Sequence, residues 1–143
     1  MKKIYLAGPY THSNKDIMTM REKELSLVAA RLLAIGYLVF SPITQAVPLT
    51  NTHVPLPHTW EFWEKLDFSF IKDWADEVWV LTLTGWEQSV GVTAEITYAQ
   101  ELGMPVKLLC VNTGEIPHTR NIKVNKFWID EKTEPIYKDE TPY

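Results

Sequence analysis

The sequence predicts an α/β protein, a three-layer α/β/α sandwich around a mainly parallel, flavodoxin-like sheet of four to five strands. Two observations support this fold class. Short apolar runs alternate along the chain with longer segments whose apolar residues recur at helical spacing. The short runs are apolar throughout, as in strands that helices cover on both faces. Such alternation forms right-handed βαβ units and favours the strand order 2-1-3-4-5.

Local signals place each element. A buried strand over residues 4–7 ends at Gly8-Pro9, and residues 10–17 are expected to form a polar loop. The helical repeat of Leu25, Val28, Leu32 and Ile35 predicts a helix that Gly36 ends. The later elements are expected as a strand at 37–40, a proline-containing loop at 44–57, a helix at 60–74, a strand at 78–83, a loop at 84–88, a helix at 89–102, a strand at 106–111, a turn at 112–114 and a short fifth strand at 126–129.

Composition limits the classes of function. The net charge of −4 and the lack of any Lys/Arg run argue against a nucleic-acid partner. No apolar stretch approaches the length of a membrane span, and the apolar run near Met1 is too short for a signal peptide. The single cysteine, Cys110, excludes an internal disulfide and is expected to be a buried core thiol. These features favour a cytoplasmic protein with no membrane partner.

Common cofactor and metal motifs are not found in the sequence. It has no Walker A motif, no Gly-x-Gly-x-x-Gly and no Gly-x-Ser-x-Gly elbow. Its four histidines are scattered and have no cysteine or carboxylate at ligand spacing on the same element. We therefore expect no cofactor and no metal site.

Glu95 is the most informative residue, because it interrupts an apolar helical pattern. It shares one face of the expected helix with Val92, Ala99 and Leu102, and that face is expected to pack inward. A buried carboxylate is costly unless it is paired, hydrogen-bonded or placed in a cleft. Glu95 is therefore a candidate nucleophile or base, and the alternative is a half-exposed, solvated glutamate.

The start of the same helix is a candidate anion site. Ser89 is expected to cap it, and Gly91 has no side chain to cover the first turn. Free backbone N–H groups therefore remain available to bind an anion. In a sheet of this order ligands bind beyond the carboxyl ends of the strands. That rule brings together the loops at 8–12, 41–57 and 84–89 around one crevice.

Asp67 is a second unusual carboxylate. It falls on the same helical face as the aromatic residues Trp63, Phe70 and Trp74. Either it has a partner or binds a ligand, or it lies at the edge of the aromatic stripe and pairs with Lys72 or a backbone group. Aromatic residues that could stack on a base or sugar are Tyr5, Tyr10, Trp60, Trp63, Trp86 and Tyr98, of which Tyr10 and Trp86 lie in the crevice loops.

Taken in order, several short segments resemble the nucleoside 2-deoxyribosyltransferase-like superfamily, which includes the 2′-deoxynucleoside 5′-phosphate N-hydrolases. The likeness covers roughly residues 1–111 and is greatest to a poorly characterised bacterial and phage branch. The segments are Tyr5-Leu6-Ala7-Gly8-Pro9-Tyr10, Phe40-Ser41-Pro42-Ile43, Asp67 followed by Ile71-Lys72 and Ala75-Asp76, Gly85-Trp86, Ser89-Val90-Gly91-Val92 with Glu95, and Leu102-Gly103 with Pro105-Val106.

The resemblance implies roles for single residues. Glu95 matches the glutamate that attacks the anomeric carbon, Asp67 an aspartate that binds or protonates near the base and sugar, and Tyr5 a tyrosine beside the nucleophile. Ser89 matches a position that is aspartate in transferases of free nucleosides and serine in 5′-monophosphate hydrolases. The residues expected to bind substrate are Gly8, Tyr10, Thr11, Trp86, Ser89 and Gly91.

The resemblance therefore implies an enzyme that cleaves the N-glycosidic bond of a nucleoside or, preferentially, a nucleoside 5′-monophosphate, by hydrolysis or by base exchange. The loop after the first strand, residues 9–12, lacks the arginine that the hydrolases use for phosphate, and Thr11, His12 and Arg21 are its candidate substitutes. The rival functions are a non-catalytic nucleotide-binding or sensing protein and hydrolysis of another N-riboside.

The resemblance also implies domain organisation and assembly. Residues 1–129 are expected to form a nucleoside deoxyribosyltransferase-like domain, and residues 130–143 an acidic C-terminal arm. Relatives complete their sites with a neighbouring subunit, which implies a homodimer or higher homo-oligomer. Aromatic residues point in several directions around the helix at 60–74, so a second covered face is expected. The alternative is that the 44–57 loop covers it.

Overall fold

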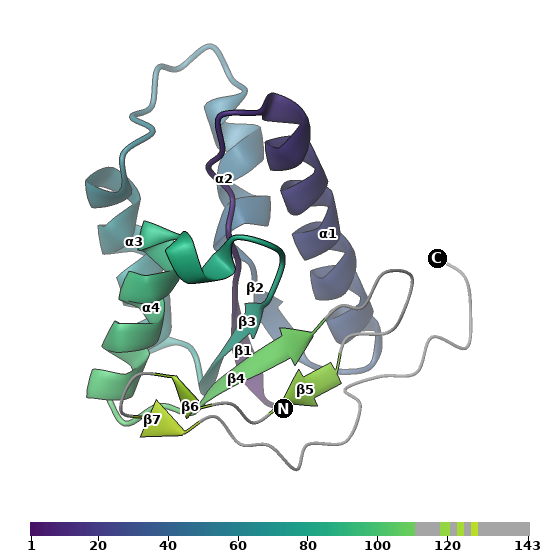
Figure 1. The fold of residues 1–143 in the computed structure, drawn as a ribbon, viewed down its shortest axis with the longest axis vertical. Helices are drawn as coiled ribbons and strands as arrows, with labels where there is room; N and C mark the ends of the chain where they lie inside the picture. Colours follow the sequence, from purple (N-terminus) through teal and green to yellow (C-terminus); the bar gives the residue numbers. More distant parts are fainter. Residues whose placement is uncertain (111–117, 121–122, 125–126, 129–143) are drawn as a thin grey trace.

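The computed structural model describes residues 1–110, 118–120, 123–124 and 127–128. Its main sheet has the order β2-β1-β3-β4-β5, which confirms the predicted α/β fold and strand order (Figure 1). The first four strands are parallel, and β5 is antiparallel to β4. The strands are β1 (Lys3–Ala7), β2 (Leu38–Phe40), β3 (Glu77–Leu81), β4 (Val106–Cys110) and β5 (His118–Arg120), with a separate antiparallel pair of β6 (Lys123–Val124) and β7 (Phe127–Trp128).

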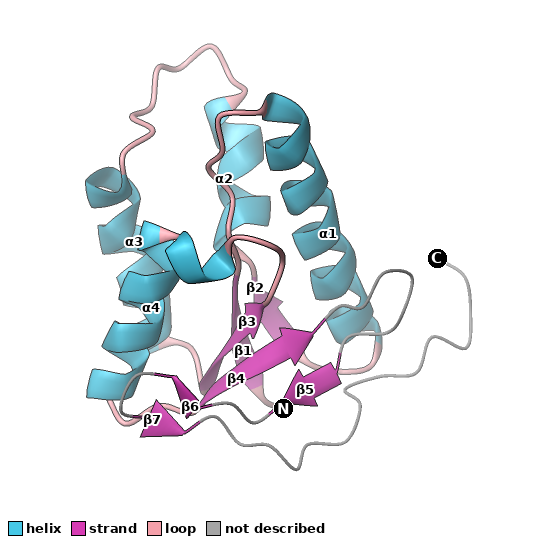
Figure 2. Cartoon of the chain, viewed as in Figure 1, coloured by secondary structure: helices cyan, strands magenta, loops and turns pink. Residues whose placement is uncertain are grey.

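Helices cover both faces of the sheet (Figure 2). They are α1 (Lys15–Ala34), α2 (Pro42–Thr50), α3 (Trp60–Asp73) and α4 (Val90–Glu101), with a short 3-10 helix, η1 (Trp86–Gln88). Side chains alternate along β1: Tyr5 and Ala7 pack with α3 and α4, whereas Ile4 and Leu6 pack with α1. The molecule therefore has two apolar cores, one on each side of the central strands.

The helix α1 begins earlier than its apolar repeat suggests. It starts at Lys15, inside the segment expected to be a loop, because the Asn14 side chain accepts a hydrogen bond from the N–H of Asp16 and caps the first turn. Ile35, expected on the apolar face, is 44% exposed because it is the residue at which the helix ends. Gly36 follows with a positive φ of 107°.

The prediction of a loop over residues 44–57 is wrong at its first half, where the chain forms α2. Ser41 caps this helix by accepting a hydrogen bond from the N–H of Thr44, and Pro42 occupies its first turn. Proline is well tolerated there because that N–H has no helical partner. Pro48 lies inside the helix, near its end, and the abundance of proline hid a capped helix start.

The inward faces of α3 and α4 differ in part from those expected. On α3 the buried residues are Asp67 and Ile71, whereas Leu66 is 36% exposed. On α4, Val92, Glu95 and Ala99 are buried as expected, but Leu102 follows the helix and is 43% exposed. Asp67 therefore lies at the centre of the buried face of α3 and not at its edge.

The end of the sheet also differs from expectation. The fifth strand is β5 and not the segment at 126–129, where residues 127–128 pair instead with β6. A short connection from β4 allows only an antiparallel neighbour, which β5 provides. The turn at 112–114, the arm at 130–143 and the side chain of Cys110 lie outside the described part of the structure. None of the described helices is long and apolar enough to cross a membrane.

Candidate active site

Three acidic side chains from three different elements meet on the α3/α4 face of the sheet. Tyr5 comes from the central strand β1, Asp67 from the middle of α3 and Glu95 from the second turn of α4. All three are buried, with exposed fractions of 0%, 7% and 4%. The Tyr5 hydroxyl donates a hydrogen bond to a carboxylate oxygen of Glu95 and also interacts with Asp67. We call these residues the acidic trio.

Burial dominates the protonation of the trio. Removal from water raises the pKa of Asp67 to about 7, and a hydrogen bond with Tyr5 opposes that rise. Burial, together with the nearby charge of Asp67, also raises the pKa of Glu95 well above its ordinary range. The pKa of Tyr5 is raised by burial and by the two carboxylates. Both carboxyl groups are therefore harder to ionise here than in water, and they titrate as a coupled pair.

Aromatic rings enclose the trio. The ring of Phe40 stacks on Phe70 at a centroid distance of 3.8 Å and lies 5.8 Å from the ring of Tyr5. Phe68 of α3 stacks on Tyr98 of α4 at 4.1 Å, and this contact ties the two helices together. Phe40, Phe68, Phe70 and Tyr98 all pack against the apolar core that contains Tyr5. Tyr98 is thus already stacked within the protein.

The start of α4 has the geometry expected of it. The Ser89 side chain accepts a hydrogen bond from the N–H of Val92 at 3.2 Å and so caps the helix. A Cβ atom added at Gly91 would lie 3.4 Å from the Trp60 ring, so the indole of Trp60 covers the first turn closely. Glu95 follows Gly91 by one helical turn and faces the core. The capped end and the nucleophile candidate therefore belong to one rigid element.

The remaining predicted binding residues lie on the two loops that follow β1 and β3. Gly8 is buried against Leu25, Tyr10 is half-buried and Thr11 is exposed. Trp86, at the start of η1, is half-buried against the same core as the trio. The structure therefore brings these loops to the carboxyl ends of neighbouring strands, as the parallel topology requires.

Sequence reasoning considered Arg21 only as a phosphate ligand, and the structure gives it another contact set. Its guanidinium donates to the backbone carbonyls of Tyr10, Thr11 and Thr84, and its side chain is only 6% exposed. Arg21 precedes Leu25 by four residues, and so it falls on the apolar face of α1. A charged residue at an inward helical position was the signal that could have revealed it.

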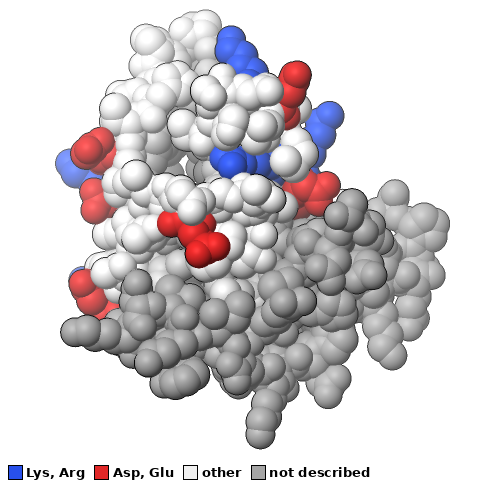
Figure 3. Space-filling view, in the orientation of Figure 1, with Lys and Arg blue, Asp and Glu red and all other residues white. Residues whose placement is uncertain are grey.

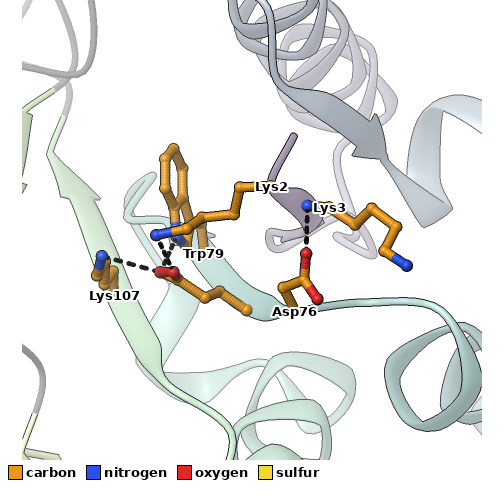
Figure 4. Close-up of polar contacts among 6 residues, drawn as sticks. Lys2, Lys3, Asp76, Trp79 and Lys107 are labelled. Carbon is orange, nitrogen blue, oxygen red and sulfur yellow. Dashed lines mark hydrogen bonds and ion pairs between the residues drawn. The ribbon is translucent and has the colours of Figure 1, made fainter.

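A second buried carboxylate, Glu77, lies on the opposite face of the sheet, at the start of β3, and sequence reasoning missed it. Its oxygens contact Nζ of Lys2 at 2.5 Å and Nζ of Lys107 at 2.9 Å, and Nε1 of Trp79 donates to it at 3.0 Å (Figure 4). These contacts lower the pKa of Glu77 despite its burial. The cluster joins β1, β3 and β4 at their amino ends, and we call it the Glu77 cluster.

Lysine, arginine, aspartate and glutamate side chains are dispersed over the described surface of the face seen in Figure 3, and they form no continuous basic patch there. In the described part of the chain, no group of three or more His, Cys, Asp or Glu side chains lies close enough to hold a metal ion.

These features define a flavodoxin-like α/β protein with a buried pair of carboxyl groups between its central sheet and the helices α3 and α4. The chain belongs to the family described as "Domain of unknown function (DUF1937)", whose model matches residues 2–110. Among solved structures, it is similar to a 2-deoxyribosyltransferase from the psychrotolerant bacterium Bacillus psychrosaccharolyticus. The two share 27% sequence identity with a TM-score of 0.52, over 78% of this chain and 77% of the other.

The structural likeness confirms the resemblance to the nucleoside 2-deoxyribosyltransferase-like superfamily that the sequence motifs predicted. No relative is found among curated proteins. The superfamily is therefore established by the fold and the solved neighbour, while the matching family model itself has no assigned function.

Proposed function

We propose that this protein is an enzyme that cleaves the N-glycosidic bond of a nucleoside or nucleoside 5′-monophosphate, with Glu95 as the nucleophile. The observation that supports this most is the acidic trio: two buried carboxyl groups whose pKa values are both raised, with a phenol hydrogen-bonded to one of them. The likeness to a 2-deoxyribosyltransferase supports an enzyme of the transferase or glycosidase type.

In the proposed reaction the working form carries its proton on Asp67 and its charge on Glu95. A protonated Asp67 removes the like charge that disfavours the Glu95 anion, and the Tyr5 hydroxyl stabilises that anion by its hydrogen bond. The Glu95 carboxylate attacks the anomeric carbon, and the electron pair of the broken C–N bond moves to the base. Asp67 gives its proton to the departing base.

The second half of the reaction releases the sugar from Glu95. In hydrolysis, water attacks the anomeric carbon and passes a proton to the Asp67 carboxylate, so both groups return to their starting state. In base exchange, a second base takes the place of water. The same residues serve both outcomes, and the acceptor decides between them.

We further propose that a 5′-monophosphate is preferred over a free nucleoside. Ser89 caps α4 with its oxygen and leaves the helix N-terminus free of negative charge, which favours a phosphate nearby. An aspartate at this position would repel that phosphate. Arg21 was a candidate substitute for the phosphate-binding arginine that the loop after β1 lacks. Its guanidinium instead donates hydrogen bonds to backbone carbonyls.

A substrate panel tests the proposal directly. The purified protein is incubated with purine and pyrimidine ribo- and deoxyribonucleosides and their 5′-monophosphates, and free base is measured by chromatography, with and without an added acceptor base. Release of base by wild type but not by Glu95→Gln is the expected result. Ligand binding without any turnover would instead support a non-catalytic nucleotide-binding protein.

The phosphate preference has its own variant. Ser89→Asp retains an N-cap, so the fold is expected to persist, but it places a carboxylate beside the proposed phosphate. We expect KM for the 5′-monophosphate to rise by about tenfold or more, with KM for the free nucleoside unchanged or lower. Equal activity of wild type on nucleosides and 5′-monophosphates would contradict the preference.

We also propose that the protein is a homo-oligomer, at least a dimer, that packs through α3. This helix leaves Phe62 and Leu66 exposed by 43% and 36%. The α2–α3 connection does not remove them from water, as the alternative required. A closed two-fold pairing would cover these side chains in both copies. Sedimentation that shows a monomer at tens of micromolar would reject this arrangement.

A further inference from the structure

We propose that Arg21 is a positioning residue that fixes the two substrate loops relative to each other, and that it thereby controls substrate binding more than bond cleavage. This proposal rests on the proposed function, because Tyr10, Thr11 and Trp86 are the residues that those loops contribute to the substrate site.

The Arg21 guanidinium connects segments that are far apart in the chain. Its Nη1 atom donates to the carbonyl oxygens of Tyr10 at 3.3 Å and Thr11 at 3.1 Å, in the loop after β1. Its Nη2 atom donates to the carbonyl oxygen of Thr84 at 2.8 Å, in the loop after β3. One planar, rigid group thus holds two loops at a fixed spacing.

The electrostatics favour this role over an ordinary surface arginine. Arg21 is 94% removed from solvent, as its exposed fraction of 6% shows, and it forms no ion pair with a carboxylate in the described structure. Its Nε atom is buried without a hydrogen-bond partner there. A buried cation is costly, and here three carbonyl dipoles are its compensation. The loops therefore cannot move apart without removing that compensation.

Close packing at Gly85 supports the same conclusion. Gly85 has a positive φ of 94°, and a Cβ atom added there would lie 2.6 Å from Nη2 of Arg21. A side chain at this position would be strained by the positive φ and would have to displace Nη2 of Arg21. The turn after Thr84 is thus shaped around the arginine.

The bonds to Arg21 also set the direction of three peptide groups. All peptide bonds of the described chain are trans, and in a planar trans peptide the N–H points opposite to the carbonyl. The N–H groups of Thr11, His12 and Gly85 therefore point away from the guanidinium, and none has a protein acceptor in the described chain. Arg21 leaves these three donors available to oxygens of a ligand.

Among the described residues, Arg21 forms no hydrogen bond with the three residues that act in the proposed reaction. Tyr5, Asp67 and Glu95 belong to β1, α3 and α4, and the hydrogen bonds of Arg21 go only to the loops. Loss of the guanidinium is therefore expected to affect the binding of substrate far more than the chemical step. This split separates a positioning role from a general loss of stability.

The main test is Arg21→Met, which keeps an apolar stem of similar length. Lys23→Met is the matched control, because Lys23 lies on the same helix and is exposed. We expect Arg21→Met to raise KM by at least about tenfold, a change of about 1.4 kcal/mol, while kcat changes by less than about threefold. Arg21→Lys keeps the charge but cannot bridge both loops. We therefore expect its KM to stay close to that of Arg21→Met and well above that of wild type.

A second measurement does not depend on turnover. Amide hydrogen exchange is followed in peptides that cover residues 8–13, 83–89 and 90–101. We expect Arg21→Met to accelerate exchange in the first two segments and to leave α4 unchanged. Gly85→Ala places a methyl group against Nη2 of Arg21 and is expected to accelerate exchange in the same two segments. It replaces Arg21→Met in this test if that variant does not fold.

These outcomes separate this proposal from the proposed function. If wild type shows no turnover on any substrate, the enzymatic proposal fails, and the exchange pattern alone decides the role of Arg21. Unchanged exchange in both loops, or equal acceleration in both loops and in α4, would overturn the positioning role. So would a fall in kcat at constant KM.

Discussion

The acidic trio and the Glu77 cluster lie on opposite faces of one sheet, and each contains a buried carboxyl group. Glu77 has a lysine on each carboxylate oxygen and an indole N–H, and its pKa is lowered. Glu95 has a phenol and a second carboxyl group, and its pKa is raised. Burial alone therefore does not define a reactive group. A buried carboxyl group without a cationic partner has a raised pKa and tends to keep its proton. A buried carboxylate paired with lysines stays ionised and links the strands that carry its partners.

The largest effect is expected from Glu95→Gln, which removes the proposed nucleophile without changing the shape of the side chain. We expect kcat for base release to fall by roughly three orders of magnitude or more. Thermal stability at pH 7 should be retained or increased, because a neutral amide replaces a carboxyl group that burial destabilises when it ionises.

The control for this variant is Glu101→Gln, which removes an exposed carboxylate from the last turn of the same helix. It should leave kcat and the melting temperature unchanged. A correctly folded Glu95→Gln protein that retains more than a few per cent of wild-type turnover would exclude Glu95 as the nucleophile. Circular dichroism establishes the folded state in each case.

The next effect is expected from Asp67→Asn. We expect kcat to fall by about 10²- to 10⁴-fold, because the leaving base loses its proton donor. In wild type, kcat/KM should rise with pH as the carboxyl pair loses its first proton and fall again when it loses its last, because burial raises the pKa values of both groups.

The pH profile of Asp67→Asn sharpens this test. With only Glu95 left to titrate, the falling limb at high pH should disappear while the rising limb remains. A profile that keeps both limbs would remove Asp67 from the role of general acid. The loss of kcat caused by Asp67→Asn is also measured with a substrate whose base is a good leaving group. That loss should be smaller, because such a base needs less help from a proton donor.

For the Glu77 cluster the expected effect is on stability and not on activity. Glu77→Gln leaves Lys2 and Lys107 without their carboxylate, which should lower the free energy of unfolding by about 3 kcal/mol. The kcat should remain within about twofold of wild type, because the cluster faces away from the trio. Glu61→Gln, an exposed carboxylate on α3, is the control. A stable but inactive Glu77→Gln protein would contradict this division of roles.

The two regions should also respond to pH in opposite directions. The pKa of Asp67 is raised on folding from 3.8 to about 7, so its contribution to stability is present below pH 3.8 and is lost as the pH rises through about 7. The pKa of Glu77 is lowered from 4.5, so its contribution is present above pH 4.5 and is lost as the pH falls through its folded-state value.

Denaturant titrations at several pH values check this contrast. Asp67→Asn should gain stability relative to wild type between pH 6 and 8, by up to about 1.4 kcal/mol for each pKa unit of the shift. Glu77→Gln should lose least relative to wild type at acid pH. Parallel stability curves for wild type and both variants would show that neither pKa shift is linked to folding.

Much of the fold could be predicted from local patterns. Apolar strands and helical repeats could be recognised because each signal lies within a few residues. Their alternation then predicted the order 2-1-3-4 of the parallel strands. The helix α2 was missed because three prolines over residues 44–57 outweighed the cap at Ser41. The antiparallel β5 was missed because its place depends on pairing with β4, which no local pattern encodes.

The site was predictable to a different extent. Glu95 and Asp67 could be singled out because each interrupts an apolar helical face, and both are buried. Their meeting with Tyr5 depends on packing between elements 90 residues apart, which the family resemblance supplied and periodicity could not. Glu77 stands at the start of an apolar strand, and its partners Lys2 and Lys107 are far from it in the sequence. No local pattern around Glu77 therefore predicted the cluster.

The order in which the trio enters the chain has a consequence for synthesis on the ribosome. Tyr5 is made first, Asp67 follows after α2, and Glu95 arrives only with α4, 90 residues after its phenol partner. Chains grow at about 5–20 residues per second and fold from the N-terminus, so the hydroxyl waits several seconds for its carboxylate. A nascent chain released before α4 would contain β1 and α3 but no complete reactive pair. If the trio acts as proposed, products truncated before α4 are expected to be inactive.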